Sequence, residues 1–554
     1  MGVYSIAHSL LALGPKDLFL FLITGSLFFC LLNYTVGVVL FHRVNSEKAG
    51  LKTPPLVPSV LPIWGNFSFR AIFDPRAWAL SASNVFGNAT PVRARFLAND
   101  VYIFQGVKNV EAFFRQRDLS SFNLHGFLLN RAFGLPTAAM KTYAKDDSGA
   151  YPKPYPESQV EPRNRIEYQL EKSLHRFLLG PGLMPLTRRF QSAIAQHFYT
   201  LPISDDWVSW DNFVTFFEQE LTAPFLNSLC GDYLLRAHPD FLANRWTFEN
   251  NIWSMIFGLP RFLAPRAYRA RDGALRALKD WHVWALQNFD PALVDADGDD
   301  PVWGSKFFRE RKTIFDTIDG FDLDAIATHD LAFIWGTTNN SIITSFWTAV
   351  ETFSDPHLLA QVRQEAEACL IIDPEAGPDQ PPQFDMDKLQ QQPVLQAIYA
   401  ETLRLRISGY FVRHHSHGDI AIDGWRIPNN HIILTSPMHT HMDPNTWGSE
   451  RPVDQFWPGR FLKPAPAPGG GSGWEFTTER APGAWIPYGG GYHMCPGRHF
   501  AKMMIIFSTA LLTTMYDCEI RADPRNLAMS MRNFGFGMSG PTSKVPARLR
   551  RRAH

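Results

Sequence analysis

This chain lacks cysteine pairs at the spacing of metal sites, and it also lacks a net charge. None of its five cysteines lies in a Cys-x-x-Cys pair, and an odd number of isolated cysteines argues against a disulfide framework or a zinc ribbon. The 53 Lys and Arg residues balance the 53 Asp and Glu residues, so nothing indicates a nucleic acid or a strongly acidic partner. The cysteine usage fits a reducing compartment for the body of the protein. The cysteines are Cys30, Cys230, Cys369, Cys495 and Cys518.

Charged residues are absent from one long stretch near the N-terminus. Residues 18–41 contain no Asp, Glu, Lys or Arg, and a helix of this length, at about 1.5 Å per residue, can cross a hydrocarbon core of about 30 Å. His42 and Arg43 follow it, whereas Lys16 and Asp17 cancel before it, so the positive-inside rule places the rest of the chain in the cytoplasm. We predict a short lumenal N-terminus over residues 1–17 and a transmembrane signal anchor over residues 18–41. The alternative is a cleaved signal peptide, which would have a shorter apolar core and a small-residue cleavage site.

Prolines are concentrated directly after this stretch. Because prolines stiffen and extend the backbone, residues 42–66 are predicted to form a basic, proline-rich hinge. The next segment, over residues 67–110, mixes short alternating apolar runs with turns, which indicates small strands and helices. With 45% hydrophobic and 14% aromatic residues, the chain can bury a large core. We predict one catalytic domain over residues 67–554.

Cys495 lies between the glycine run Gly489–Gly491 and a stretch that reads as an amphipathic helix. Glycines adopt backbone conformations closed to other residues and leave room for a large flat group. Pro496 suits the first turn of a helix, and a cysteine just before a helix is favoured as a thiolate by the helix dipole and the unpaired N–H groups. A thiolate beside an open slot suits a haem iron as its axial ligand. A glycine-rich turn with a buried structural cysteine is the alternative.

The pattern Tyr488-x-x-Gly491-x-x-x-Cys495-Pro-Gly resembles the haem-binding loop of the cytochromes P450. Tyr488 stands where that family usually has Phe, and His493 stands where it often has an Arg that pairs with a haem propionate. A histidine can also donate to a carboxylate. The resemblance implies that Cys495 is the axial iron ligand of a haem b, and that His493, Tyr488 and Gly491 contribute to cofactor binding.

A second chemical landmark is the predicted helix over residues 330–353. Between strongly apolar flanks, a small and polar stripe forms because residues four apart share a helix face. A buried helix with such a stripe faces something that needs hydrogen bonds, or it packs closely through small residues. The P450 resemblance implies that this helix crosses the haem, with Ser341, Asn340 and Thr337 positioning water and bound oxygen. The stripe consists of Gly336, Thr337, Asn340, Ser341 and Thr344.

Asn340 stands where the family pattern has an acid, and an amide does not relay protons by ionising. This departure, together with Arg532-Asn-Phe-Gly-Phe-Gly537 and Val545-Pro-x-Arg548 in the tail, resembles the branch that holds the sterol 7α- and 12α-hydroxylases and prostacyclin synthase. That branch includes monooxygenases and an isomerase that rearranges a peroxide without reductase or dioxygen. The reaction type stays open between these two.

Glu401 and Arg404 are three residues apart on a predicted helix over residues 395–405, a spacing that lets their side chains pair. Phe456-Trp-Pro-Gly-Arg460-Phe461 resembles the Phe-x-Pro-x-Arg segment of the P450s, and the resemblance implies a structural Glu401–Arg404–Arg460 cluster under the haem. Arg413 falls where many members place a strand arginine against a propionate; a surface basic cluster is the alternative. With three motifs in the family order, the chain is identified as a member of the cytochrome P450 superfamily over nearly its whole length.

Four further segments are interpreted from their composition. Residues 142–161 are polar and proline-rich, which predicts an exposed loop. Residues 251–263 are apolar and form either a core helix or a shallow membrane contact at a substrate entrance. Glu365 and Glu367 are interpreted as a solvated helix face. Arg548–Arg552 are interpreted as a solvated basic tail that could also attract an acidic redox partner or anionic lipid.

The resemblance implies a mainly α fold with a small β subdomain, the cytochrome P450 fold, preceded by one N-terminal transmembrane helix. It implies a haem-thiolate monooxygenase that inserts oxygen from O2 into a lipophilic, sterol- or terpenoid-like substrate such as a secondary metabolite. NADPH would supply electrons through cytochrome P450 reductase. One alternative is a P450-type isomerase or dehydratase that needs no reductase, and another is a non-catalytic membrane protein that binds haem or lipid. The expected location is the endoplasmic reticulum membrane, with the catalytic domain facing the cytoplasm and no nucleic acid as a partner.

Overall fold

The computed structural model describes residues 14–46, 50–61, 65–66, 90–96, 99–371, 380–448, 450–466, 472–479 and 482–553. The chain divides into two compact units. The smaller unit comprises Met1–Gln116 and Val412–Thr435, and the larger comprises Arg117–Phe411 and Ser436–His554. The expectation of a mainly helical chain with small sheets is confirmed.

The smaller unit contains a four-stranded sheet in the order β1-β2-β7-β4. β1 and β2 pair antiparallel, with Val92 opposite Ile103, and β2 and β7 pair parallel. β5 and β6 form a separate hairpin. The predicted strands and helices of residues 67–89 lie outside the described residues. The elements of this unit are α2 (Pro15–Ser46), β1 (Val92–Phe96), β2 (Asn99–Ile103), α5 (Val107–Arg115), β4 (Phe411–His414), β5 (Ile420–Ile422), β6 (Trp425–Ile427) and β7 (Ile432–Thr435).

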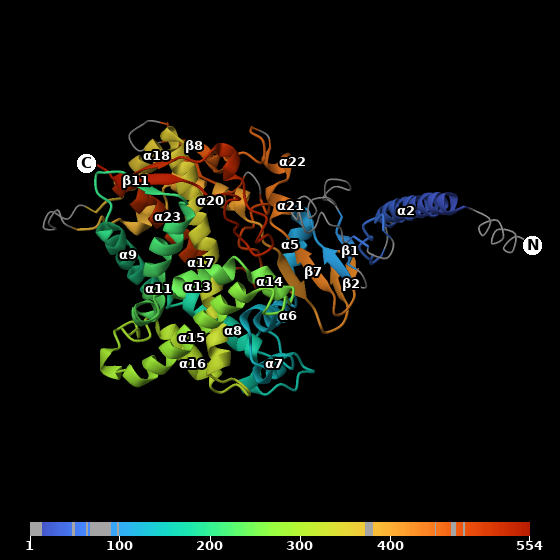
Figure 1. Ribbon diagram of the computed structural model, residues 1–554, viewed down its shortest axis with the longest axis horizontal. Helices are drawn as coiled ribbons and strands as arrows, with labels where there is room; N and C mark the ends of the chain where they lie inside the picture. The colour runs from blue at the N-terminus through green and yellow to red at the C-terminus, as the bar shows by residue number, and fades with distance from the viewer. Residues whose placement is uncertain are drawn as a thin grey trace, which may run out of the picture. The chain divides into compact units, whose positions relative to one another are not determined.

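α2 is the long N-terminal helix drawn in blue in Figure 1, and it is exposed over most of its length. It is long and apolar enough to cross a membrane. Near its C-terminal end it belongs to the core of the smaller unit, because Phe41 is 1% exposed and packs with Val92, Ala94 and Ile103 of the sheet. The predicted anchor and the core of the smaller unit therefore share one helix.

The proline-rich stretch after α2 is held on both sides. The backbone N–H of Val57 donates to the carbonyl oxygen of Arg93 at 2.8 Å, which ties the stretch to β1. The Asn33 side-chain amide donates to the carbonyl oxygen of Ser59 at 2.6 Å, which ties it to α2. This stretch therefore runs from the sheet back along the second half of α2.

The larger unit is mainly helical and carries two small sheets, β10-β11-β3 and the hairpin β8-β9. Its elements are α6 (Phe122–Leu128), η1 (Leu129–Phe133), α7 (Thr137–Tyr143), η2 (Pro162–Asn164), α8 (Ile166–Leu178), α9 (Leu183–Thr200), β3 (Val208–Trp210), α10 (Val214–Phe216), η3 (Phe217–Leu221), α11 (Thr222–Cys230), α12 (Tyr233–Ala237), α13 (Phe241–Glu249), α14 (Ile252–Ile256), α15 (Pro265–Asn288), η4 (Pro291–Leu293), α16 (Lys306–Phe315), α17 (Leu323–Ser354), α18 (Pro356–Glu367), α19 (Met386–Leu389), α20 (Pro393–Arg406), α21 (Met438–His441), α22 (Pro444–Trp447), η5 (Pro458–Phe461), β8 (Leu462–Pro466), β9 (Ser472–Phe476), α23 (Arg498–Met515), β10 (Tyr516–Ile520), η6 (Pro524–Leu527) and β11 (Ala547–Arg551).

α17 is the central helix of the larger unit. Asp322 caps its start by accepting the Ala325 N–H at 2.9 Å, and most of its side chains from Ala325 to Phe353 are buried. A helix that is apolar on nearly all sides is stable only inside a fold. α23, α20, α18 and α15 pack against it, and Figure 1 shows α17 in the interior with α23 and α20 beside it.

Three of the four compositional interpretations are corrected. The C-terminal arginines are not a solvated tail, because β11 pairs with β10 and Arg548 and Arg550 bind Glu519 and Asp517 across the pair. Residues 142–161 are not uniformly exposed, because Asp146 is buried and accepts the Glu167 N–H at the start of α8.

Glu365 is likewise not on a solvated face. Its two carboxylate oxygens accept the backbone N–H groups of Val394 and Leu395 at 2.8 and 2.9 Å. These N–H groups begin α20, where no side chain of the preceding Gln392 caps the helix. A carboxylate from α18 therefore supplies the cap that a helix start needs.

The apolar segment over residues 251–263 does not form a core helix. Only the short α14 lies within it, and Phe257, Phe262 and Leu263 are 74%, 79% and 63% exposed. The interpretation of this segment as a shallow membrane contact stays a prediction.

Candidate active site

Cys495 is the most accessible cysteine of the described chain, whereas Cys230, Cys369 and Cys518 are buried. It lies just before Gly497, where α23 begins, and its backbone N–H donates to the Tyr488 carbonyl oxygen at 3.0 Å. Burial by the surrounding protein raises the pKa of its thiol, while the backbone N–H groups of Gly497 and Arg498 lower it. The sulfur is thus open to a ligand from one side and faces the N-terminus of a helix on the other.

The glycine run before Cys495 takes the conformations that its residue type allows. Gly489 and Gly491 have φ values of +74° and +66°, which L side chains rarely adopt. No side chain therefore projects from these two positions over the cysteine.

α20 holds the cysteine loop by two hydrogen bonds. The Tyr399 hydroxyl donates to the Tyr488 hydroxyl at 2.9 Å, and the Trp485 indole N–H donates to the Ala400 carbonyl oxygen at 3.1 Å. Burial raises the pKa of both tyrosines, so both hydroxyls stay protonated and keep this hydrogen bond. The Tyr488 hydroxyl therefore links the cysteine loop to α20 by a hydrogen bond that a Phe at this position could not make.

His493 faces a carboxylate of this chain. Its Nδ1 lies 3.1 Å from Glu171 on α8, and its side chain is 7% exposed. Burial raises the pKa of Glu171, but the hydrogen bond from His493 and the charges of His493 and His175 outweigh it, so the pKa is lowered. The predicted partner of a propionate is thus also a link between the cysteine loop and α8.

The structure brings Glu401, Arg404 and Arg460 together in one buried cluster. Arg404 donates to both Glu401 oxygens at 2.7 and 2.9 Å, and Arg460 Nε lies 3.3 Å from the same carboxylate. The side chains are 0%, 0% and 3% exposed. Breaking a buried pair by removing one partner leaves an uncompensated charge, so each member depends on the others.

Other guanidinium N–H groups of the cluster donate hydrogen bonds to backbone carbonyl oxygens. Arg404 donates to the carbonyl oxygens of His441 and Val453 at 2.8 Å each. Arg460 donates to the carbonyl oxygens of Trp447 and Pro452. The two guanidinium groups therefore fix the segment that runs between α21 and the start of η5.

His441 joins this cluster to the cysteine loop, and sequence reasoning missed it. Its Nε2 accepts the Ile486 N–H at 2.9 Å, so its Nδ1 carries the proton and donates to the Arg404 carbonyl oxygen at 3.2 Å. Burial and the charge of Arg404 lower the pKa of His441 to about 3. A single buried histidine gives no signal in the sequence, because its partners lie 37 and 45 residues away.

The polar stripe of α17 lies where it was predicted, and its hydroxyl groups turn back to their own helix. Thr337 donates to the Phe333 carbonyl oxygen at 2.9 Å, and Ser341 donates to the Thr337 carbonyl oxygen at 3.2 Å. Gly336 is exposed, and a Cβ at this position would meet no atom within 4 Å. The hydroxyl oxygens of Thr337, which is half-buried, and of Ser341, which is 6% exposed, thus keep lone pairs for an incoming donor such as water. We call the side of α17 at Gly336 and Thr337 its open face.

Asn340 has a partner outside its helix. Its Oδ1 accepts the Met538 N–H at 2.8 Å. This contact joins α17 to the residue that directly follows the segment Arg532–Gly537.

An aromatic group lies near the open face of α17. The Trp335 ring centroid is 5.6 Å from Phe133 and 5.8 Å from Phe536, and the Phe536 ring is 4.6 Å from Trp253. Aromatic rings supply large apolar area. They come from η1, α17, the segment after η6 and α14.

Arg413 lies on β4 in the smaller unit and is 8% exposed. Its Nη1 donates to the carbonyl oxygen of Val412 at 3.0 Å. It is therefore not part of an exposed basic cluster, and its contact with a propionate stays a prediction.

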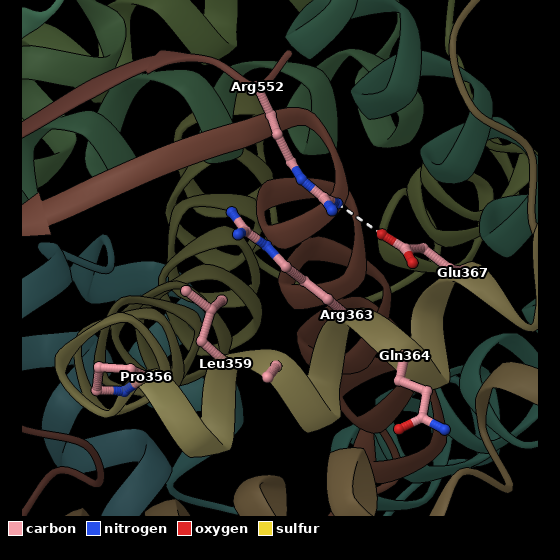
Figure 2. Close-up of a pocket in the computed structure, with 7 residues that line it drawn as sticks. Pro356, Leu359, Arg363, Gln364, Glu367 and Arg552 are labelled. Carbon is pink, nitrogen blue, oxygen red and sulfur yellow. Dashed lines mark hydrogen bonds and ion pairs between the residues drawn. The ribbon is translucent and has the colours of Figure 1, made fainter. Parts of the chain in front are cut away.

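A surface pocket on α18 is separate from Cys495. This hollow has a volume of about 510 Å³, and Arg552 lies 2.6 Å from Glu367 within it. Figure 2 shows the side chains that line it. Arg363, which also lines it, donates to the carbonyl oxygens of Thr513 and Tyr516 and to Asp517. Because its charged side chains are already paired, the pocket offers no charge for a ligand.

The acidic loop over residues 295–300 is not a cation site. Asp297, Asp299 and Asp300 bind Arg188, Arg189 and Arg309. Within the described parts of the chain, no group of three or more His, Cys, Asp or Glu side chains is placed to hold a metal ion.

Comparison with known proteins gives consistent results. The family model of Cytochrome P450 matches residues 244–545. The cytochrome P450 monooxygenase fsoE of Humicola fuscoatra is 30% identical, covering 92% of this chain and 89% of that protein. The cytochrome P450 monooxygenase efuG of Hormonema carpetanum is 29% identical, covering 92% of each. A bifunctional cytochrome P450/NADPH–P450 reductase of Gibberella moniliformis is 27% identical over 52% of this chain and 24% of its own length.

Among solved structures, the retinoic acid bound cyanobacterial CYP120A1 has the same fold. Its TM-score is 0.61 at 18% identity, covering 89% of this chain and 98% of that one. The mainly helical arrangement with small sheets is thus the P450 fold. From the family match and the full-length relatives, the chain belongs to the cytochrome P450 family and is a cytochrome P450 monooxygenase.

Proposed function

We propose that this monooxygenase holds a haem b through Cys495. The observation that carries the proposal is the accessible Cys495 sulfur just before α23, where the backbone N–H groups of Gly497 and Arg498 offset part of the rise in thiol pKa that burial causes. A thiolate is the ligand form of cysteine, and helix N-termini stabilise it. The donor type and its surroundings fit the haem-thiolate chemistry that the family implies.

The residues around Cys495 also fit a large flat group. Gly489 and Gly491 present no side chains beside the sulfur, and the Tyr488–Tyr399 pair supports the loop from α20. His493 would share its ring between a propionate and Glu171. Glu401, Arg404 and Arg460 keep the segment between α21 and η5 in place and do not take part in the chemistry.

When bound, the haem supplies the activation of dioxygen, and its thiolate ligand favours O–O cleavage. The chain itself positions the reactants. Ser341 and Thr337 accept hydrogen bonds from water on the open face of α17, because their protons are directed to backbone carbonyls. Gly336 leaves room for a substrate at the same level of the helix.

The substrate is lipophilic, of sterol or terpenoid size, and belongs to secondary metabolism. Support comes from the apolar walls formed by Phe133, Trp335 and Phe536, and from relatives that are fungal P450 monooxygenases. Asn340 and the Arg532–Gly537 segment support the branch that contains the sterol hydroxylases.

NADPH supplies the electrons through cytochrome P450 reductase at the endoplasmic reticulum membrane. Support for the reductase comes from the relative whose name joins a P450 with an NADPH–P450 reductase. The apolar helix α2 supports a single-pass anchor, with residues 67–554 as the catalytic domain on the cytoplasmic side.

The carbon monoxide difference spectrum of the reduced, haem-loaded protein tests this proposal. We expect the thiolate-type shifted band for the wild type and its loss in Cys495→Ser, because a serine hydroxyl does not supply a thiolate. Cys369→Ser, at a buried cysteine, is the matched control and should keep the band. A folded Cys495→Ser protein with an unchanged band would refute the iron ligand assignment.

The stoichiometry of turnover tests the reaction class. We expect one NADPH and one O2 consumed for each oxygen atom that enters the product. A product formed without NADPH or O2 would instead identify isomerase or dehydratase chemistry, the alternative suggested by Asn340 in place of an acid.

A further inference from the structure

Asn340 connects α17 to a loop almost two hundred residues later. Its Oδ1 accepts the Met538 N–H at 2.8 Å. Because a backbone N–H can only donate, the oxygen of the amide must face Met538, and the NH2 group must point elsewhere. The orientation of this side chain is therefore set by the chain itself.

Gly537 makes this contact sterically possible. Its φ is +121°, and a Cβ at this position would overlap the Oδ1 atom of Asn340. The amide thus lies directly over the α-carbon of Gly537. The pairing requires both an amide-sized side chain on α17 and a glycine in the loop.

The other side of the loop is tied to the segment after α20. The Ser408 hydroxyl donates to the Gly537 carbonyl oxygen at 2.8 Å, and the Gly535 N–H donates to the Ser408 carbonyl oxygen at 2.8 Å. Trp347, two turns after Asn340 on α17, donates to the Ser539 carbonyl oxygen at 2.9 Å. Among these ties, only the Asn340 bond acts from the open face of α17.

The loop carries one large side chain to the candidate substrate site. Phe536, directly before Gly537, packs 5.8 Å from Trp335 and 4.6 Å from Trp253. Trp335 immediately precedes Gly336, where α17 is open. A shift of the loop would therefore move an aromatic wall of that open space.

We propose that Asn340 is a positioning residue that fixes the Gly535–Met538 loop on α17 and so sets the place of Phe536, which makes it a determinant of ligand selectivity. The bond needs only an oxygen acceptor at this position, because the Met538 backbone N–H is the donor. The inference deepens the proposed function and rests on it only where a haem ligand is used as a probe.

Three variants separate this function from simple loss of packing. Asn340→Ala removes the acceptor. Asn340→Asp keeps an oxygen in the same place and is the conservative variant that should retain the bond. Thr328→Ala, earlier on the same helix, removes a buried hydroxyl whose one hydrogen bond among the described residues goes to the Asp324 carbonyl oxygen, and it is the matched control.

Hydrogen–deuterium exchange of the haem-loaded protein measures the bond directly. In peptides that span residues 534–539, we expect the Met538 amide to exchange at least about tenfold faster in Asn340→Ala, because an amide without its acceptor loses protection. Asn340→Asp and Thr328→Ala should stay within about threefold of the wild type. Unchanged exchange in Asn340→Ala would overturn the proposal.

Spectral titration with two nitrogen ligands measures selectivity. Imidazole is small enough to reach the iron without touching the walls, whereas clotrimazole must fit among them. We expect Asn340→Ala to change the dissociation constant of clotrimazole at least about fivefold and that of imidazole less than about twofold, since affinity changes of this size follow from altered packing. Asn340→Asp should restore the wild-type ratio. Equal changes for both ligands, or none for either, would refute the selectivity role.

The two measurements also separate this inference from the proposed function. If the wild type lacked the thiolate-type band and bound neither azole, the haem assignment would fail, and the exchange result would still decide the Asn340–Met538 bond. If the band and imidazole binding were normal but the exchange were unchanged, only the role of Asn340 would fall.

Discussion

Glu365 is a single carboxylate whose surroundings determine its role. It caps α20 from α18, and burial raises its pKa from 4.5 to about 7, more than the Val394 and Leu395 N–H groups lower it. Between these two pH values the folded state binds more protons than the unfolded state. The stability that this gives is complete below pH 4.5 and is lost as the pH rises through 7.

We therefore expect Glu365→Gln to remove a downward slope of stability with pH. The free energy of unfolding of the wild type, relative to that of the variant, should fall between pH 4.5 and pH 7 and be constant above it. Urea unfolding at several pH values measures this difference.

Because both proteins share the buried His439 and His441, whose effect on stability has the opposite sign, the comparison cancels those groups. Glu367→Gln, at an exposed carboxylate that binds Arg552, is the control. Parallel pH profiles for the wild type and Glu365→Gln would contradict the role assigned to Glu365.

At the scale of elements, α13 is joined to its neighbours by charges that are only partly satisfied. Arg245 and Glu249 are 0% and 2% exposed, yet their closest approach is 3.9 Å. Arg245 Nη2 also donates to the Trp335 carbonyl oxygen at 3.4 Å, while its Nε and both Glu249 oxygens have no hydrogen-bond partner among the described residues. Burial raises the pKa of the nearby Glu218 to about 7, although Arg245 lowers it. This group connects α13 to η3 and to α17 just before its open face.

We expect Arg245→Leu to lower the free energy of unfolding by about 3–5 kcal/mol, because it leaves Glu249 buried without its counter-charge. Arg245→Leu combined with Glu249→Leu should be less destabilised than Arg245→Leu alone, since replacing both charges by apolar groups removes the unpaired one. Chemical unfolding of the single and double variants measures the coupling.

Additive effects of the two substitutions would show that the charges do not interact. Lys279→Leu, at a more exposed ion pair with Asp324, is the control and should cost less than about 1 kcal/mol.

The elements that sequence predicted well are those with local signals. The α17 helix follows from its apolar flanks, the cysteine loop from Gly489–Gly491 and Pro496, and the Glu401–Arg404 pair from its spacing. The connections between elements depend on tertiary structure. The backbone N–H groups of Ile486, Val394 and Met538 donate to the side chains of His441, Glu365 and Asn340. The partners are 29 to 198 residues apart, and no periodicity in the sequence encodes such pairs.

The strand β11 was not predicted, although its sequence has the pattern of a strand. β11 alternates buried Ala547 and Leu549 with the outward Arg548 and Arg550, the period of two that a strand shows. The basic character of these residues concealed it. The opposite case is α2, whose uniform apolar character gave no sign that its last turns pack into the core of the smaller unit.

At the scale of the whole molecule, α2 serves two environments. Its first half is exposed and apolar, as a membrane requires, and the second half carries Asn33, which binds Ser59, and Phe41, which is buried against the sheet of the smaller unit. From residue 18 to residue 32 the helix is about 22 Å long at 1.5 Å per residue, shorter than a hydrocarbon core of about 30 Å. A membrane-spanning α2 therefore brings the Val57–Ser59 stretch close to the lipid surface.

This division of α2 predicts different consequences for two truncations. Deleting residues 2–36 removes the apolar half and keeps Phe41, and deleting residues 2–43 removes Phe41 as well. Both proteins should lose membrane association. The longer deletion should also lower the free energy of unfolding, relative to the shorter one, by about 3–5 kcal/mol, the range for removing a buried aromatic side chain.

Phe41→Ala in the full-length chain should reproduce the loss, whereas Leu40→Ala, at a side chain that is 53% exposed, should not. Equal stabilities of the two truncated proteins would show that α2 is an anchor alone and that the smaller unit is complete without it.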